Sequence, residues 1–378
     1  MTLRSLRRFV LALALSTASL AAAETTWLPG AAEVTGLAGA RFTTTLEVAN
    51  PGATASTLTI GLVPMEGAAA PAPVARTLAA GESLRVREAL KTLFGLAEAA
   101  GTITVTSDAP LVSSLTTQNV AAPEGAYGLG LLPVAQGDLL GAGETGHAIW
   151  VSQSADSSTG YRTNLSVTLA EAGTVVEVRV LDAEGRVAGT ATVTAGSPFV
   201  WQRSVKALAG DADLPVARAE FEVKAGRATA FAVVNDNVTS DAIALQAERV
   251  VPGALDRLVS GAALSPGLLG AYWVTDLRLF NPGSAAVTAT ILSVGAPSAA
   301  SATVTVPAKG VVEVARVLER LGFPERTASA LRVTATEPLL VAARTNNVDP
   351  AGVRKGTFSA PQFVPAWGAG LLGTGAPG

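Results

Sequence analysis

The stretch 275–283, TDLRLFNPG, is the clearest structural signature in this sequence. Leucines at positions 277 and 279 predict an extended strand with one buried face, and the Asn-Pro-Gly end predicts a turn. A weaker copy, TTTLEVANPG, occupies 43–52, and a third trace, RTNLSV, occupies 162–167. We therefore expect a chain of repeated units in which Thr275 and Asp276 are polar residues at a strand edge.

A second landmark keeps the same spacing. Asn119, Asn237 and Asn347 each precede Val and follow an apolar, strand-like run. These landmarks are 118 and 110 residues apart, and Leu46, Leu165 and Leu277 are 119 and 112 residues apart. A period this long exceeds that of ordinary solenoid repeats, so each unit is predicted to be a whole domain.

The order of elements is also repeated. Short strands with alternating aliphatic residues lead to a helical spacing that ends at Gly95, Gly210 or Gly322. We expect this helix to cross from one sheet to the other, and the two strands after it to form a hairpin. The predicted fold is all-β: three tandem two-sheet sandwiches, each with one short helical crossover. The predicted boundaries are 24–135, 136–253 and 254–367, followed by a Gly-rich flexible tail at 368–378.

The chain resembles the tandem immunoglobulin-like domains of secreted, uncharacterised bacterial proteins. The resemblance rests on 273–283, on the VLxxLG turn at 317–322, and on ARTNN at 343–347 with GTF at 356–358. The third unit matches well, the first moderately and the second poorly, because the second lacks Asn-Pro-Gly. These are packing and turn motifs, so the resemblance implies an immunoglobulin-like fold and a secreted setting but no activity.

Residues 1–23 have the pattern of a secretory signal peptide. Arg4, Arg7 and Arg8 precede an apolar run that ends in three alanines at 21–23. The ordinary secretion route is favoured over the twin-arginine route, because Phe9 follows the arginine pair directly. We expect a mature protein that is secreted or periplasmic, with association with the cell surface as one form of this, and not inserted in the membrane after cleavage.

Composition excludes several classes of site. The sequence has no Cys among its 378 residues, which excludes disulfides, thiolate nucleophiles and Cys-ligated metals. Its net charge of −3 lacks the basic excess that nucleic-acid binding requires. We therefore expect no nucleic-acid partner and no cofactor.

His147 is the single histidine in the sequence, and no nucleophile motif or second metal-ligand spacing accompanies it. A surface or strand-start histidine is the default interpretation. The acid pairs Asp211 with Asp213 and Asp182 with Glu184 lie in turn-like stretches, where carboxylates stay solvated. Calcium at 211–213 or at 235–237 is a weaker alternative, because neither loop has enough oxygen ligands.

The repeated asparagines are expected to have turn roles, since Asn tolerates left-handed backbone and caps strand ends. Four aromatic residues lie near the first strands of units 2 and 3: Trp150, Tyr161, Tyr272 and Trp273. Exposed rings could stack on sugars, whereas buried rings would cap the sandwich cores. Burial is the favoured interpretation.

We expect a non-enzymatic structural, adhesive or protein-binding protein, whose partner is an extracellular or envelope protein or glycan. The alternative is a carbohydrate-binding protein in which Tyr272 and Trp273 form an exposed, coplanar stacking platform. A hydrolase of unrecognised geometry is a third interpretation, and it requires a pocket that gathers His147, a serine and a carboxylate. The sequence predicts no catalytic, cofactor or metal residue and leaves the ligand-binding residues unknown.

Overall fold

The computed structural model describes residues 23–36, 39–121, 127–238, 240–295, 300–348 and 354–356. Residues 1–22 of the predicted signal peptide at 1–23, the GTF motif beyond Gly356 and the tail at 368–378 lie outside these residues. In the described part of the chain, no helix is long and apolar enough to cross a membrane.

The protein is all-β, and its strands fall into three successive units. Unit 1 contains β1 Glu24–Thr35, β2 Arg41–Ala49, β3 Ser56–Pro64, β4 Val74–Leu78, β5 Ser83–Val86, α1 Ala89–Phe94, β6 Ala99–Ser107, β7 Val112–Asn119, β8 Tyr127–Gly130 and β9 Val134–Ala135.

Unit 2 contains β10 Leu140–Gly141, β11 Thr145–Gln153, β12 Tyr161–Leu169, β13 Val175–Asp182, β14 Val187–Thr194, β15 Phe199–Ser204, α2 Val205–Ala209, β16 Leu214–Ala225, β17 Arg227–Asp236 and β18 Ala242–Gln246. Unit 3 contains β19 Asp256–Pro266, β20 Tyr272–Phe280, β21 Val287–Val294, β22 Ser301–Val306, β23 Val311–Val314, α3 Val317–Arg320, β24 Thr327–Ala335, β25 Leu340–Val348 and β26 Arg354–Gly356.

Unit 2 shows the sandwich most plainly. One sheet has the order β10-β17-β12-β15, with β18 also paired to β17, and the other has the order β11-β16-β13-β14. In units 1 and 3 the first long strand links the two layers. Most of β1 pairs with β6, whereas its last residues, Val34 and Thr35, pair with β2. The strand β19 does the same between β24 and β20.

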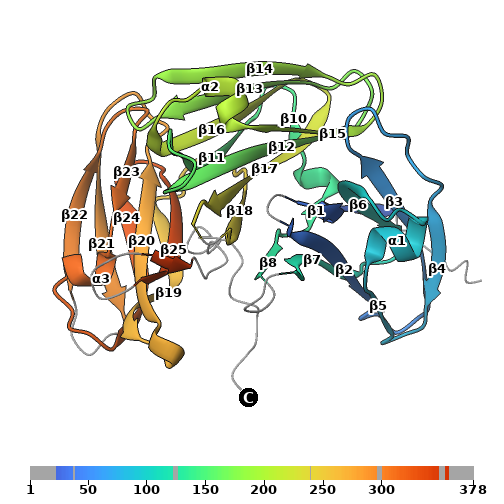
Figure 1. Cartoon of the computed structure of the whole chain (residues 1–378), viewed down its shortest axis with the longest axis horizontal. Coiled ribbons are helices and arrows are strands. Elements are labelled where there is room, and N and C mark those ends of the chain that lie inside the picture. Colours follow the sequence, from blue (N-terminus) through green and yellow to red (C-terminus); the bar gives the residue numbers. More distant parts are fainter. Residues whose placement is uncertain are drawn as a thin grey trace, which may run out of the picture.

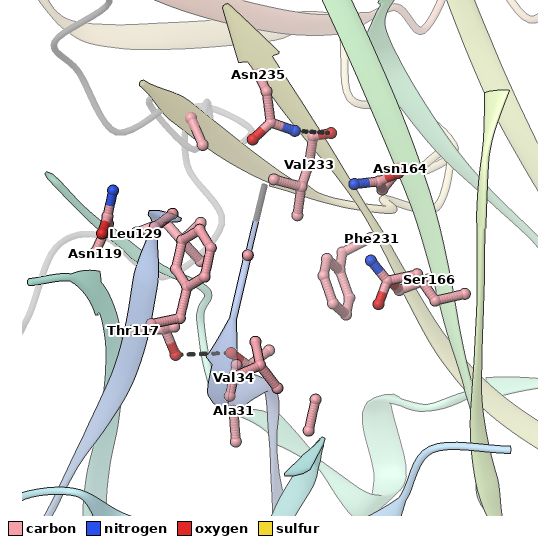
Figure 2. A pocket seen from close by; sticks show the side chains of 18 of the residues that line it. Ala31, Val34, Thr117, Asn119, Leu129, Asn164, Ser166, Phe231, Val233 and Asn235 are labelled. Carbon is pink, nitrogen blue, oxygen red and sulfur yellow. Dashed lines mark hydrogen bonds between the residues drawn. The ribbon is translucent and has the colours of Figure 1, made fainter. Parts of the chain in front are cut away.

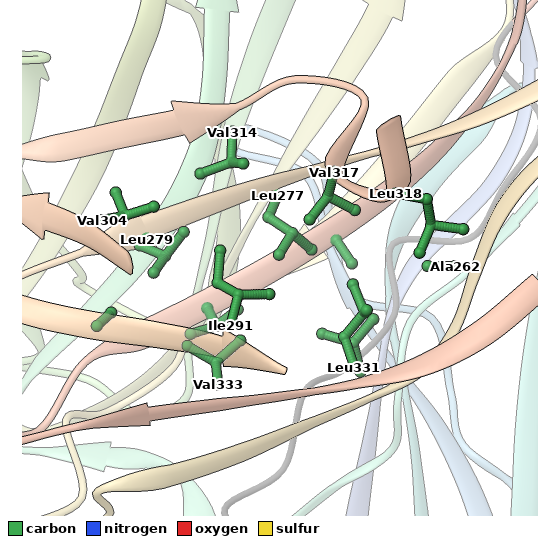
Figure 3. Packing of buried hydrophobic residues seen from close by; sticks show 14 of the residues in the cluster. Ala262, Leu277, Leu279, Ile291, Val304, Val314, Val317, Leu318, Leu331 and Val333 are labelled. Atoms are coloured by element: carbon green, nitrogen blue, oxygen red, sulfur yellow. The ribbon is translucent and has the colours of Figure 1, made fainter. Parts of the chain in front are cut away.

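Alternation of side chains explains the cores. In β20, Leu277 and Leu279 point inward and are fully buried, as their spacing of two predicts. They meet Ile291 from β21 and Val333 from β24 in a core of aliphatic side chains (Figure 3). The helix α3 adds Val317 and Leu318 to this core.

The predicted helical crossovers are confirmed. Each short helix connects a strand of one sheet to a strand of the other, as α1 does between β5 and β6. Gly95, Gly210 and Gly322 follow the three helices with φ of 72°, 66° and 80°, values that favour glycine.

The predicted hairpin after each helix is wrong. The strands β6 and β7 do not pair with each other, since β6 pairs with β1 and β3 whereas β7 pairs with β2 and β8. The same holds for β16 with β17 and for β24 with β25. The turn between these strands therefore passes from one sheet to the other. Inward and outward side chains still alternate along each strand, but the two strands do not form hydrogen bonds with each other.

The expectation of edge chemistry at Thr275 and Asp276 is also wrong, because β20 is an interior strand between β25 on one side and β19 and β23 on the other. The Thr275 hydroxyl accepts a hydrogen bond from the Ala263 N–H at 2.8 Å and is 2.8 Å from the Thr345 hydroxyl. Asp276 accepts from the Arg316 N–H at 2.8 Å. Both residues thus tie neighbouring elements of unit 3 to β20.

The three units form an arch in which unit 2 lies between units 1 and 3 (Figure 1). Units 2 and 3 share a buried apolar cluster that includes Trp150, Tyr161, Phe280 and Leu340. Units 1 and 2 share a smaller one: Trp27, Val63, Val134, Leu139 and Val200. Contacts between the units are therefore part of the fold.

Candidate functional site

A pocket lies between units 1 and 2, with a volume of about 310 Å³. Its walls come from β1, β2, β7 and β8 of unit 1 and from β12, β15 and β17 of unit 2. Figure 2 shows side chains of both units around this space, with Asn164, Ser166 and Phe231 from unit 2 and Ala31 and Leu129 from unit 1. We call it the 1–2 pocket.

The unit 2 wall is the outer face of a sheet. Leu165 and Val167 of β12 point into the core, so the alternate residues Asn164 and Ser166 point outward to the pocket. Strand pairing places Gln202 of β15 and Phe231 of β17 on either side of Ser166. Pairing also places Val233 beside Asn164, which makes a continuous patch across three strands.

Several amides of this wall are free to bind a ligand. The side chains of Asn164 and Gln202 make no hydrogen bond within the described part of the chain, although both are half-buried. Asn235 reaches only the Val233 carbonyl, at 3.5 Å, which is the limit of a hydrogen bond. Since an amide offers both donors and acceptors, this wall can bind groups that need both.

The unit 1 wall is apolar and closely built. It presents Ala31, Val34, Ala40 and Phe42. Gly30 has φ of 86° at a bulge of β1, and its carbonyl accepts a hydrogen bond from the Thr117 hydroxyl at 2.7 Å. The polar groups of this wall are thus used inside unit 1, and its apolar atoms face the pocket.

Among the described residues that line the pocket, a single side chain is charged, that of Arg162, and none is a carboxylate. Its Nη1 donates to Asn237 Oδ1 at 3.0 Å, and burial lowers the pKa of the guanidinium, an effect that Asp236 opposes. Because no carboxylate or histidine occurs among them, the described lining residues offer no acid–base pair for hydrolysis.

His147 does not lie in the 1–2 pocket. It is at the start of β11, as one interpretation expected, but its side chain is only 10% exposed, so the surface interpretation is wrong. The His147 ring centroid is 5.0 Å from that of Phe280 in unit 3, and Nδ1 is 3.6 Å from Glu220 Oε1. Burial lowers the pKa of His147 to about 4, which keeps the imidazole neutral.

No catalytic arrangement surrounds that imidazole in the part of the chain that the structure describes. Nδ1 finds no hydrogen-bond partner among the described residues, and those lining the small hollow beside it include no serine. In the neighbouring interface, the Arg278 guanidinium stacks on the Trp150 ring. The gathering of histidine, serine and carboxylate that a hydrolase would need is not present in the part of the chain described.

The acidic candidates have local roles. Asp211 pairs with Lys206 at 2.5 Å, and Asp213 Oδ1 is 3.4 Å from the Ala155 N–H. Asp182 accepts from the backbone N–H groups of Glu184 and Arg186, at 3.0 and 2.8 Å. No group of three or more metal-ligating side chains occurs among the described residues.

The 235–237 stretch is divided between two roles. Asn235 faces the 1–2 pocket, whereas Asp236 is buried and accepts from the Val238 N–H at 2.8 Å. Asn237 Nδ2 donates to the Thr159 carbonyl at 2.9 Å. The three side chains therefore do not converge on one point as calcium ligands would.

The repeated asparagines at 119 and 347 close the ends of strands. Asn119 Oδ1 accepts from the Arg41 N–H at 3.0 Å, and Asn347 Oδ1 accepts from the Tyr272 N–H, also at 3.0 Å. Each holds the first residue of the neighbouring strand, β2 or β20, in the same way. Their repetition thus reflects a shared structural role, and Asn119 also lines the 1–2 pocket.

Trp150 and Tyr161 are buried, but not in the core of their own sandwich. They lie in the interface between units 2 and 3, where the Arg344 guanidinium is 4.9 Å from the Trp150 ring centroid and 4.7 Å from that of Tyr161. Their rings are buried because unit 3 covers them. A repeat pattern in the sequence does not show which faces of neighbouring units come into contact.

Tyr272 and Trp273 are both half-buried. They are consecutive in β20, so their side chains point to opposite faces of the sheet. Tyr272 packs against the core of unit 3, and its hydroxyl donates to Glu325 at 3.0 Å. These two rings therefore do not form one coplanar platform.

Sequence reasoning missed the residues of the 1–2 pocket. Asn164, Ser166 and Gln202 are polar residues at outward positions of strands, which is ordinary for a sheet that faces water. They line a pocket only because unit 1 packs against the outer face of that sheet. The comparisons add no further assignment, because no protein-family model matches the chain and no curated protein matches it significantly.

Proposed function

We propose that this chain is an exported, non-enzymatic binding protein with an adhesive role, which holds a group of an extracellular or envelope partner in the 1–2 pocket. The observation that carries the proposal is the combination of unpartnered amides, Asn164 and Gln202, with the lack of any acid–base pair among the described lining residues. Export rests on the secretory pattern of residues 1–23.

The packing of the three units supports a role in binding, because it holds the pocket walls in place. Buried contacts join unit 2 to both neighbours, so the pocket walls are held by two packed sandwiches and not by a loose linker. A buried 2.6 Å hydrogen bond between the Thr102 and Thr168 hydroxyls also joins unit 1 to unit 2. Walls fixed in advance lower the ordering cost of binding.

Retention of partner material by the immobilised mature protein tests the proposal. Wild-type protein should retain a component of the envelope or extracellular fraction, and Asn164→Leu or Gln202→Leu should reduce that retention about tenfold or more. Thr192→Leu is the matched control, because Thr192 is exposed on β14 in the other sheet of unit 2. If both pocket variants retained as much partner material as the wild type, the proposal would be contradicted.

Catalysis is tested on the same protein. A broad panel of ester, peptide and glycoside substrates should show no turnover above the uncatalysed rate. Turnover at enzymatic rates, lost in Asn164→Leu but kept in Thr192→Leu, would show that the pocket transforms its ligand and would contradict a purely binding role.

A further inference from the structure

We propose that the 1–2 pocket binds a neutral sugar unit of one or two rings. This inference rests on the proposed function and names the ligand class of the same site. It differs from a platform at Tyr272 and Trp273, because recognition would come from amides on one wall and apolar side chains on the other.

The amide wall matches hydroxyl groups. A sugar hydroxyl both donates and accepts hydrogen bonds, and a side-chain amide supplies both partners within one planar group. Asn164, Gln202 and Asn235 come from three adjacent strands. Gln202 pairs with Ser166 and Asn235 pairs with Arg162, so each of these amides is two residues along the strand from Asn164. Such diagonal neighbours are about 7–8 Å apart, a spacing that suits hydroxyls on opposite sides of one sugar ring or on two linked rings.

The apolar wall matches the C–H face of a ring. Phe42 and Leu129 line the pocket from unit 1, the wall without free amides. Phe231 and Val233 add apolar atoms beside Ser166 and Asn164 on the unit 2 wall (Figure 2). Phe231 is only 5% exposed, so its ring is held by the surrounding side chains and offers limited surface to the pocket. A ligand must therefore be apolar on one side and polar on the other, as a pyranose is.

Charge argues for a neutral ligand. The described lining holds no carboxylate that would attract a cation, and the negative charge of Asp236 offsets part of the positive charge of Arg162. Size agrees with this class, since about 310 Å³ is at the lower end of small-molecule pockets.

The strand edges argue against an extended peptide. Peptides usually bind sheets by pairing with a free edge, but β1, β12 and β17 are interior strands whose neighbours occupy both sides. The strand β15 is an edge, yet the Val200 carbonyl accepts from the Glu66 N–H at 2.9 Å and the Gln202 carbonyl accepts from Arg203 at 2.7 Å. Recognition at the unit 2 wall therefore has to use side chains.

A glycan array followed by calorimetry with the mature protein tests the inference. We expect at least one neutral mono- or disaccharide to bind with one ligand per chain, and Asn164→Leu and Gln202→Leu to weaken binding about tenfold each. A deoxy analogue lacking a bound hydroxyl should also bind at least tenfold more weakly, because it leaves a buried amide without a partner. Thr192→Leu should bind as wild type does, and circular dichroism should show that all variants are folded.

The possible outcomes separate this inference from the proposed function. Binding of a peptide, a charged glycan or an apolar dye that Asn164→Leu abolishes, with no neutral sugar bound, would overturn the inference and leave the proposed site standing. Absence of any ligand that depends on Asn164 or Gln202 would overturn both. If Asn164→Leu and Gln202→Leu both left sugar binding unchanged, the sugar would bind elsewhere and the inference would be overturned.

Discussion

Arg278 of unit 3 lies with its guanidinium carbon 4.8 Å from the ring centroid of Trp150 in unit 2. The same guanidinium donates to the Val151 carbonyl at 2.7 Å, to the Pro215 carbonyl at 2.8 Å and to Glu313 at 2.8 Å. Arg344 stacks on the same Trp150 ring. Although burial lowers the pKa of Arg278 to about 10, it stays charged at neutral pH and joins two sandwiches.

Arg278→Met should destabilise this interface. The change keeps apolar volume but leaves the Val151 and Pro215 carbonyls without their donor, so we expect a loss of about 2–4 kcal/mol in the free energy of unfolding. Arg320→Met, at an exposed position of the same unit, should change stability by less than about 0.5 kcal/mol. Urea denaturation measures both, and equal midpoints for Arg278→Met and wild type would contradict the assigned role.

Asn281→Ala should destabilise unit 3 through the turn that follows β20. The Asn281 amide is fully buried, donates to the Ala285 and Val306 carbonyls at 2.7 and 3.1 Å, and accepts from the Gly283 N–H at 2.8 Å. We expect a loss of about 2–3 kcal/mol, because the buried Val306 carbonyl, the Ala285 carbonyl and the Gly283 N–H all lose a partner. Ser284→Ala is the control, because Ser284 is exposed, and it should leave the free energy of unfolding nearly unchanged.

A second asparagine allows this assignment to be repeated in unit 1. Asn50 donates to the Thr54 and Leu78 carbonyls at 2.8 and 3.1 Å and accepts from the Gly52 N–H at 3.0 Å. Asn50→Ala should therefore show a similar loss. A neutral effect at both positions in thermal unfolding would show that the turns are held by other contacts. In unit 2, Ala170 follows the corresponding strand β12.

These residues also show what the sequence could predict. Leu277 and Leu279 alternate with a period of two, which is a local property, so the strand and its inner face follow from the residues themselves. The glycines after the three helices are equally local signals. Partner choice is not local, which is why the strands on either side of a turn were expected to pair and instead lie in opposite sheets.

The site depends on contacts between units, and a single strand pattern carries no information about them. Arg278 and Phe280 occupy outward positions of β20 and would be exposed in an isolated sandwich, yet unit 2 buries both. Asn164 and Gln202 likewise become pocket residues only because unit 1 lies above their sheet. The resemblance to immunoglobulin-like repeats concerns strands and turns. It therefore could not predict the interface around Arg278 or the 1–2 pocket.

Asp241→Asn should change how stability depends on pH. Burial raises the pKa of Asp241 to about 6 in the folded protein, against an ordinary value of 3.8. The folded state thus retains a proton that the unfolded state has lost, so the wild type loses stability as pH rises from about 4 to about 6. The variant lacks this loss and should gain about 1–3 kcal/mol over wild type between pH 4 and pH 7.

Urea midpoints at pH 4, 5, 6 and 7 measure the effect at Asp241. Asp138→Asn is the control, since Asp138 is exposed, and its stability should stay within about 0.5 kcal/mol of wild type. A constant difference between Asp241→Asn and wild type across these pH values would show that the buried carboxyl titrates alike in both states.

His147→Leu should have the opposite dependence on pH. The folded pKa of about 4 lies below the ordinary value of 6.5, because the imidazole is buried beside Phe280 and Glu220 only partly offsets that burial. The unfolded state therefore binds a proton first as pH falls, and wild type loses about 2–3 kcal/mol between pH 6.5 and pH 4 that the variant keeps. The lost ring packing would add a constant offset at every pH. Because the chain has one histidine, the difference between the two stability curves isolates its titration, and parallel curves would mean that His147 is protonated equally in the folded and unfolded protein.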